Sequence, residues 1–388
     1  MIRVLRPYAR FVWDAAFAAA FIEPVRAVLS MGSIAVAVAL MLVFEGFQSG
    51  LDHQLASVPS QLPAELVALQ PGMANFIGPR SVLPQNVRAE VEAVPGVRVA
   101  DPLVSVPVIY ERNGRRTPIT VIGYDTAGGP QHVVAGKPIS AARELVVDSV
   151  LASKHRLKVG DTVEVLGEDW TIAGLSAETA TMFTPYVFAR YDDLVDLYLS
   201  GDLGDDFAEE PPLLSFLLVR IAPGFAVEQV RAAIESEVDR VDVRSPGELA
   251  RGDVALGRRL IGPILQVMIV IAWLGGALVV GIAGYTTVEH RRRELGVMKA
   301  IGTPSRLLVA ALAAEMLTTT TVAFGLAVLL AELVGRLVGS VSPEYLVLIT
   351  EPGVVLRTIG ITLIAACLGI TIPVQAVARI DPALAFRS

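Results

Sequence analysis

Four apolar runs constrain this chain more than any other feature of its sequence. They cover residues 27–47, 258–285, 307–330 and 354–373. Each run supplies the roughly 20 apolar residues that a helix needs to cross a bilayer. With 53% hydrophobic and only 18% charged residues, the chain of 388 residues is also too apolar for an ordinary soluble protein. We therefore predict a membrane protein with four transmembrane α-helices.

The basic residues predict which ends of these helices face the cytoplasm, because arginine and lysine beside transmembrane helices stay preferentially inside. They occur before the first run, between the second and third, and after the fourth, and four crossings bring all three groups to one side. The expected cytoplasmic parts are an amphipathic segment at residues 1–26, the segment 286–306 and the tail 374–388, so that both termini are cytoplasmic. The expected outer parts are residues 48–257 and the loop 331–353.

The outer segment 48–257 is long enough to bury a core of its own and shows short strand-like and helical runs in alternation, which predicts a large α+β domain. Asn113-Gly114 predicts a tight hairpin turn, because both residues tolerate a positive φ. A second hairpin is predicted around residues 167–169. Residues 144–148 are expected to form a strand and residues 149–155 a helix.

A helix start is predicted at the end of this domain, with Ser245 as N-cap, Pro246 at the first helical position and Glu248 three residues after the cap. Two interpretations remain open for this helix. It either continues almost unbroken toward the second apolar run, as a stiff stalk, or ends near Gly252 or Gly257.

An acidic segment at residues 201–212 carries five carboxylates and no basic residue. Its oxygen spacing does not match an EF-hand loop, so a solvated loop is favoured over a site for a cation or a basic partner. The sequence contains no Walker A motif, no H-E-x-x-H and no G-x-S-x-G, which argues against a catalytic role for this chain and predicts no metal site. Its basic clusters lack interleaved aromatic residues, so no nucleic-acid partner is expected.

The segment between the second and third apolar runs is basic and amphipathic. Leu295, Met298 and Ile301 recur at helical spacing, and Gly302 is placed to end the helix. From these residues alone, the helix docks into a groove on a protein partner, or it forms a basic patch that fixes topology and touches anionic membrane lipids.

Two further features concern the helices themselves. Glu315 lies within the third run, where an ionisable side chain is costly and is expected to face the protein interior as a hydrogen-bonding or conformational element. Small residues four apart on the second run predict close helix packing, either within the chain or between two copies. These residues are Ala272, Gly276, Ala277 and Gly281.

The order of one span, a large outer domain and three more spans resembles the FtsX/MacB-type permeases of ABC transporters. The resemblance also rests on the basic cluster followed by Glu-Leu-Gly-Val-Met-Lys-Ala-Ile-Gly at residues 294–302, and on residues 135–163, which are similar to the MacB-type periplasmic core domain. Residues 44–48 and 64–67 look most like the DevC branch. The resemblance assigns contact with an ATPase to a set of residues in the basic segment. They are Arg291, Arg292, Arg293, Glu294, Leu295, Met298, Lys299, Ile301 and Gly302.

The resemblance implies a non-catalytic subunit in the bacterial inner membrane that works with a separate ATPase, and that ATPase binds the ATP and Mg. A second permease copy, a periplasmic HlyD-type adaptor and an outer-membrane channel are further expected partners. The implied function is mechanotransmission, in which ATP hydrolysis moves the outer domain to export a lipid, glycolipid, lipoprotein or drug-like substrate. The alternative is an FtsX-like signaller that activates a cell-wall hydrolase without transport.

Overall fold

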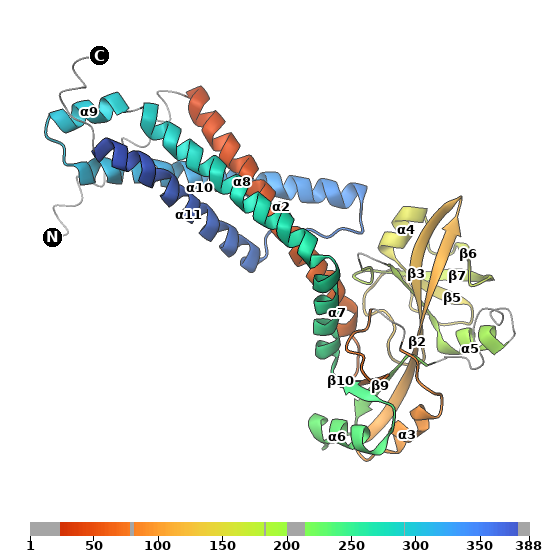
Figure 1. Ribbon diagram of the computed structural model, residues 1–388. Coiled ribbons are helices and arrows are strands. Elements are labelled where there is room, and N and C mark those ends of the chain that lie inside the picture. Colours follow the sequence, from red (N-terminus) through yellow and green to blue (C-terminus); the bar gives the residue numbers. More distant parts are fainter. Residues whose placement is uncertain (1–23, 78–80, 182–183, 200–213, 291, 379–388) are drawn as a thin grey trace. The chain divides into compact units, whose positions relative to one another are not determined.

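The computed structural model describes residues 24–77, 81–181, 184–199, 214–290 and 292–378 (Figure 1). Most of the predicted amphipathic segment, the acidic segment 201–212, Arg291 and the end of the tail lie outside the described residues. The chain divides into two compact units. The first comprises residues 1–50, 263–341 and 347–388, and the second comprises residues 51–262 and 342–346.

Four described helices are long and apolar enough to cross a membrane, which agrees with the predicted fold class. They are α2 (Pro24–Ser60), α8 (Gly262–His290), α10 (Ser305–Val341) and α11 (Pro352–Ala378). A short helix, α9 (Arg292–Ala300), connects α8 to α10. α2 is continuous from the first unit into the second, so one unbroken helix joins them.

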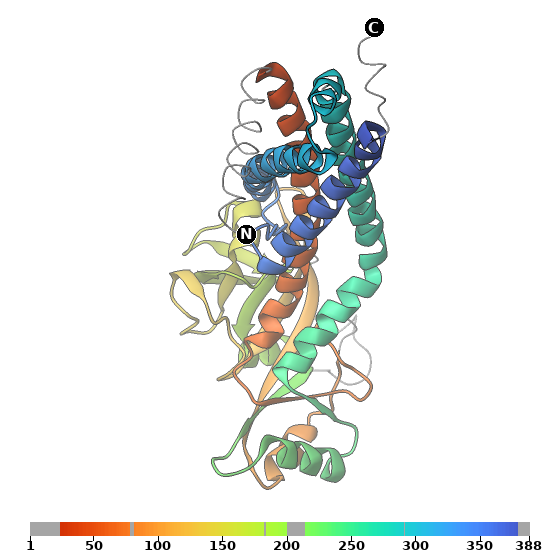
Figure 2. The same ribbon diagram turned by 90° about the vertical axis from the view of Figure 1, so that its left-hand side faces the viewer.

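The long helices of the first unit pack through small and branched apolar side chains. α10 contributes an alanine every fourth residue, at Ala323, Ala327 and Ala331, and all three are fully buried. Such small residues let helix backbones approach one another closely. α2, α8 and α11 run alongside one another in both views of the ribbon (Figure 2).

The second unit is built on a ten-stranded mixed sheet in the order β10-β1-β9-β2-β3-β8-β5-β7-β4, with β6 paired to β7. The neighbouring pairs β3/β8 and β5/β7 are parallel and the other pairs are antiparallel. The strands are β1 (Leu66–Leu69), β2 (Val97–Arg112), β3 (Arg115–Tyr124), β4 (Val133–Gly136), β5 (Glu144–Asp148), β6 (Thr162–Val165), β7 (Glu168–Ser176), β8 (Tyr186–Arg190), β9 (Phe216–Ile221) and β10 (Asp242–Arg244).

Two helix pairs cover different parts of this sheet. α3 (Val87–Ala93) and α6 (Val227–Glu237) pack on the strands around β1 and β9, and α4 (Ser149–His155) and α5 (Tyr191–Leu199) pack on those around β5 and β8. The strand β2 is 16 residues long and pairs with β9 near its start and with β3 near its end. Because both halves share this strand, they form one continuous α+β domain.

The predicted turn at Asn113-Gly114 is confirmed: both residues have positive φ, and Arg112 pairs with Arg115. The second hairpin turns one residue earlier than predicted. Leu166 and Gly167 hold the positive φ values, while Glu168 and Asp169 are already paired in β7. The predicted strand 144–148 and helix 149–155 are also confirmed, as β5 and α4.

The predicted helix start at Ser245 is confirmed, with both hydrogen bonds of a capping box to Glu248. This helix, α7 (Pro246–Leu260), ends at Ile261, and α8 begins at Gly262. Residues 258–260, which we predicted to open the second transmembrane helix, are therefore the last turn of α7. Pro263 lacks a backbone N–H and clashes with a preceding helical turn, which explains the interruption.

Candidate functional site

The basic amphipathic segment forms α9, and its end is fixed by backbone hydrogen bonds. Thr303 N donates to Met298 O at 3.0 Å and Gly302 N donates to Lys299 O at 3.1 Å, which is the Schellman pattern. Gly302 has φ +97°, a value that favours glycine at this position. The helix therefore ends where the sequence predicts, before α10 begins at Ser305.

The apolar residues of α9 do not share one face. Leu295 is buried, and it packs with Met298 against Val288, Leu308 and Leu312 of α8 and α10. Ile301 is 78% exposed and Val297 is 42% exposed. The predicted docking stripe of Leu295, Met298 and Ile301 is thus divided, because its first two members hold α9 onto the membrane helices.

A different stripe is exposed on α9. Glu294, Val297 and Ile301 are all exposed, and their spacing of three and four residues places them on one side of the helix. Arg293 is also exposed, while Lys299 is half-buried. These residues form an exposed side of α9 within the described chain. Arg292 begins the helix, but nothing is described of its side chain, and Arg291 lies outside the described residues.

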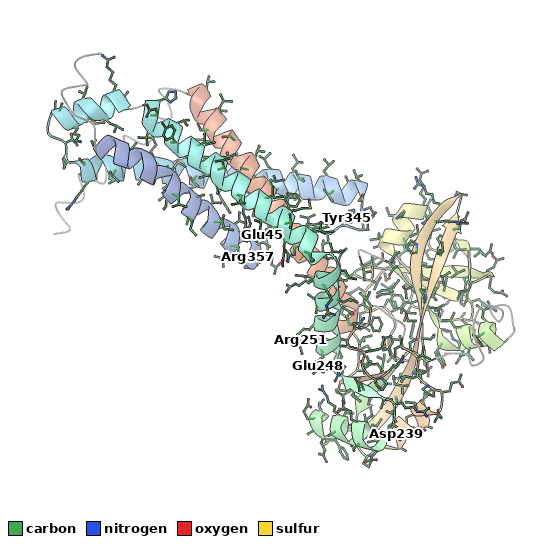
Figure 3. All side chains as sticks on the ribbon, viewed as in Figure 1. Glu45, Asp239, Glu248, Arg251, Tyr345 and Arg357 are labelled. Carbon is green, nitrogen blue, oxygen red and sulfur yellow. The ribbon has the colours of Figure 1, made fainter. Side chains whose placement is uncertain are left out.

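The first unit contains a charged cluster that we did not predict as a site. Glu45 of α2 is only 2% exposed, and its Oε1 accepts a hydrogen bond from Trp273 Nε1 of α8 at 2.9 Å. Its Oε2 lies 3.0 Å from Arg357 Nε of α11. Figure 3 shows Glu45 and Arg357 together where α2 and α11 meet. Three helices are therefore joined by one carboxylate.

The position of Glu45 explains why the cluster was missed. Within the first apolar run it is followed by Gly46, Phe47 and Gln48, so the sequence presents it as a residue at the edge of the run. In the structure α2 continues to Ser60, and Glu45 lies about 26 Å along the helix from Val28 at about 1.5 Å per residue. An intramembrane carboxylate needs a polar or charged partner. The one feature of the sequence that could have indicated this partner is Arg357, a basic residue within the fourth apolar run.

Glu315, the intramembrane residue that we did predict, lies on α10. Its side chain is half-buried and has an interaction partner. Two hydroxyls in the same unit are buried without a hydrogen bond to any residue that the structure describes, Thr320 Oγ1 of α10 and Thr362 Oγ1 of α11. Polar groups are therefore distributed along the interior of this unit, and the Glu45 side chain is among them at only 2% exposure.

The small residues of α8 lie against helices of the same chain. A Cβ placed on Gly276 would collide with the Met41 side chain of α2. A Cβ placed on Gly369 of α11 would lie 2.8 Å from Gly281 Cα. Ala272 is buried, and Ala277 packs against the buried core of the first unit. Of the two alternatives that the sequence left open, the geometry supports packing within the chain.

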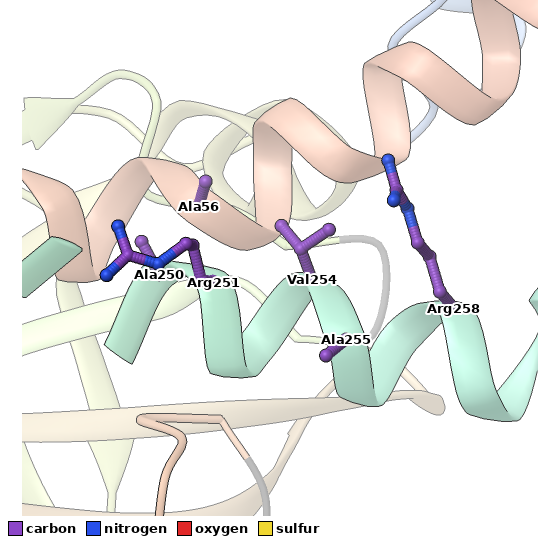
Figure 4. Close-up of a pocket in the computed structure, with 6 residues that line it drawn as sticks. All are labelled: Ala56, Ala250, Arg251, Val254, Ala255 and Arg258. Carbon is purple, nitrogen blue, oxygen red and sulfur yellow. The ribbon is translucent and has the colours of Figure 1, made fainter. Parts of the chain in front are cut away.

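In the second unit, the end of α2 packs against α7. Arg258 donates to Asp52 from Nε at 3.2 Å and from Nη2 at 2.7 Å, and Gly257 fits against Leu55. The charged hydrogen bond to Asp52 raises the pKa of Arg258. A groove of about 660 Å³ runs beside this contact (Figure 4). Its lining residues are Ala56, Ala250, Arg251, Val254, Ala255 and Arg258.

Two carboxylates fix α7 to the rest of its unit. Backbone N–H donation from Ser245 lowers the pKa of Glu248 to about 2, and Arg231 of α6 adds to the effect through Nη2 at 2.9 Å. Asp253 is fully buried and accepts hydrogen bonds from the backbone N–H groups of Phe76 and Ile77. Its burial raises the pKa to about 7. In the described part of the chain, no group of three or more His, Cys, Asp or Glu side chains is placed to hold a metal ion.

Comparison with known proteins identifies two families along the chain. Residues 29–237 match the MacB-like periplasmic core domain, and residues 266–382 match the FtsX-like permease C-terminal domain. Two uncharacterized ABC transporter permeases of Mycobacterium tuberculosis are 26% and 27% identical to this chain, over 93% of it and 95% of each relative.

Among solved structures, the periplasmic region of MacB from Actinobacillus actinomycetemcomitans aligns with 10% identity and a TM-score of 0.35, over 49% of this chain and 92% of that structure. The extracellular domain of the noncanonic ABC-type transporter YknZ from Gram-positive bacteria aligns with 12% identity and a TM-score of 0.34, over 47% and 99%.

Proposed function

The chain belongs to the FtsX/MacB-type permeases of ABC transporters, and we propose that it couples ATP hydrolysis by a separate ATPase subunit to movement of its outer domain. The observation that carries this proposal is the exposed stripe of α9, formed by Glu294, Val297 and Ile301 between two membrane-crossing helices. Two exposed aliphatic residues beside charged ones are better accommodated in the groove of a protein partner than in contact with water.

Movement of α9 can reach the rest of the chain because α9 is not a loose segment. Leu295 and Met298 pack it onto α8 and α10, so a force on its exposed side acts on both helices. α2 then offers a continuous helical connection from the first unit to the second. We take these features as support for mechanotransmission, with the coupling residues confined to the exposed stripe and its basic neighbours.

The proposed function also includes an assembly with further subunits. We infer two permease copies with two ATPase subunits in the bacterial inner membrane, with both termini in the cytoplasm and the sheet domain outside. A chain with four crossing helices is short for enclosing a path alone, which favours two copies. The proposed cargo is an amphiphile such as a lipid, glycolipid, lipoprotein or drug-like molecule, as in the DevC branch with its adaptor and outer channel.

The test is copurification with the proposed ABC ATPase subunit. A variant carrying Val297→Asp and Ile301→Asp should reduce the recovered ATPase at least tenfold. The two charges would enter an apolar contact, and a few such residues contribute most of the binding free energy of an interface. Val134→Asp is the matched control, since the exposure of this aliphatic residue, 61%, lies between those of Val297 and Ile301, but Val134 is on β4 of the outer domain. Unchanged recovery with the α9 variant would remove α9 as the ATPase contact.

A further inference from the structure

Arg357 uses only part of its guanidinium within the described chain. Its Nε donates to Gly353 O at 3.2 Å and lies 3.0 Å from Glu45 Oε2. Nη1 and Nη2 make no hydrogen bond with any described residue, and the side chain is 60% exposed. A guanidinium carries five N–H donors in a planar fork, so the four on Nη1 and Nη2 remain available to an acceptor outside the described chain.

The contact between Arg357 and Glu45 is an ion pair without a well-aligned hydrogen bond. The Nε–H of Arg357 is directed to the carbonyl of Gly353, and Glu45 Oε2 accepts no hydrogen bond within the described residues although it is buried. A buried carboxylate oxygen in that state is costly, since attraction to the arginine only partly offsets its desolvation. The arginine is therefore held by charge, without a directed hydrogen bond to Glu45.

Arg357 also lies close to the start of α11. It is about 8 Å along α11 from Pro352 at about 1.5 Å per residue, near the end of the helix that we expect to face outside. An exposed arginine at this level is stable only with a polar or anionic partner. The planar guanidinium fork matches the geometry of a phosphate or carboxylate better than lysine does.

Glu45 connects this position to α2. The next residue, Gly46, accepts a hydrogen bond at its carbonyl from Leu348 N at 2.9 Å, and a Cβ on Gly46 would lie 3.2 Å from Ile349. The cluster thus lies beside a close contact between α2 and the segment that leads into α11. Releasing Arg357 from Glu45 removes the one ion pair between described residues of α2 and α11.

We propose that Arg357 binds the anionic headgroup of an amphiphile in the outer leaflet, and that this headgroup competes with Glu45 for the guanidinium and so loosens α2 from α11. The inference rests on the proposed function, in which an amphiphile is the cargo. The ligand class is an acyl-chain molecule with a phosphate or carboxylate headgroup. Trp273 retains the Glu45 carboxylate through Nε1 when the arginine turns to the ligand.

Binding of phosphatidylglycerol to the full chain in detergent tests the site, with phosphatidylcholine of the same acyl chains and inorganic phosphate as comparison ligands and native mass spectrometry as the readout. Arg357→Gln should weaken phosphatidylglycerol binding at least tenfold, the loss of one charge-assisted contact. Glu45→Gln should strengthen it several-fold, because the competing anion is gone. Inorganic phosphate should not displace the lipid, since it lacks the acyl chains.

Arg336→Gln is the matched control, because Arg336 is 77% exposed on α10 and pairs with Glu332 at 3.0 Å. It should change binding less than twofold. If Arg336→Gln weakens binding as much as Arg357→Gln, the effect is one of general surface charge. If Glu45→Gln weakens binding, Glu45 does not compete for the arginine. If inorganic phosphate displaces the lipid, the site binds a free anion and not an amphiphile. Each of these results overturns the proposal.

Two further measurements keep the test decisive. If Arg357→Gln does not fold, Arg357→Lys serves instead: it keeps the charge but lacks the planar fork, and it should weaken binding about three- to tenfold. Unaltered binding by a folded Arg357→Lys variant would overturn the assigned geometry. The binding assay contains no ATPase, so the two proposals fail separately. If the unaltered chain does not bind phosphatidylglycerol but its ATPase recovery falls in the α9 variant, the headgroup site alone is refuted. If the unaltered chain binds the lipid but ATPase recovery is unchanged in the α9 variant, the coupling function alone is refuted.

Discussion

The carboxylate of Asp253 accepts a hydrogen bond from the backbone N–H of Phe76 at 2.8 Å, which ties α7 to the segment that follows β1. The same oxygen accepts from Ile77 N at 2.9 Å, and Phe76 itself is stacked on Phe216 of β9. α7 is the last helix before the chain enters α8. A buried side chain on this helix therefore holds it to the sheet domain.

Asp253 predicts a pH-dependent stability. Burial raises its pKa from an ordinary 3.8 to about 7, against the lowering effect of the two backbone hydrogen bonds. Between these pH values the folded chain keeps a proton that the unfolded chain has released, so stability falls as the pH rises through the interval. Asp253→Asn removes the charge and keeps an oxygen acceptor. It should raise the unfolding temperature of the solubilised chain at pH 8 and leave it unchanged at pH 5.

Asp253→Ala is the contrasting variant for this prediction. It leaves the N–H groups of Phe76 and Ile77 buried without an acceptor, so it should destabilise the chain by about 1–3 kcal/mol at both pH values. An equal shift of Asp253→Asn at pH 5 and pH 8 would contradict the assigned titration.

Gly252, the residue before Asp253, lies where α7 closely contacts the segment that follows β1. A Cβ on Gly252 would collide with the backbone carbonyl of Ala74, whereas a Cβ on Gly247 of the same helix meets only Arg251 Nη1 at 3.7 Å. Glycine to alanine in a helix ordinarily stabilises by about 0.5–1 kcal/mol. Gly247→Ala should therefore be neutral or stabilising in thermal unfolding, and Gly252→Ala should be destabilising. Equal behaviour of both variants would mean that α7 can move away from Ala74.

Local signals were sufficient for much of the fold. The turn at Asn113-Gly114 depends on two adjacent residues that tolerate positive φ, and the start of α7 depends on Ser245 and Glu248 within one helical turn. Interactions of this kind are confined to a few consecutive residues, so the local sequence is nearly sufficient to predict them. The long shared strand β2 and the order of strands depend on distant pairing that no local pattern specifies.

The site was harder to predict because it depends on which residues meet. Glu45 and Arg357 are far apart in sequence, and each looks like an isolated charge at the edge of an apolar run. On α9, helical spacing correctly grouped Leu295 with Met298 but could not tell whether that side contacts a partner protein or the chain's own helices. Met298→Asp would thus disturb the packing of α9 itself, and Val297 and Ile301 are the better positions to probe an ATPase.

Glu315 remains a prediction from the sequence, and two substitutions separate its possible roles. As a conformational element, Glu315→Gln should retain much of the permease-dependent ATP hydrolysis, because the amide still forms hydrogen bonds, whereas Glu315→Leu should lose it. Activity is measured with the ATPase subunit in reconstituted membranes across a range of pH. Complete loss in both variants, together with a pH dependence that disappears, would favour a proton relay instead.

Substitutions of two adjacent glycines of α8 distinguish packing of this helix within the chain from packing between two copies. Gly276 faces Met41 of α2 with no room for a Cβ, while nothing lies within 4 Å of a Cβ placed on Gly275. Overpacking a filled contact costs about 1–3 kcal/mol. Gly276→Leu should therefore lower the unfolding temperature of the solubilised chain, and Gly275→Leu should not. Native mass spectrometry should find the same number of permease copies in both variants. If Gly276→Leu instead leaves the unfolding temperature unchanged but separates two copies, this face of α8 is the subunit interface.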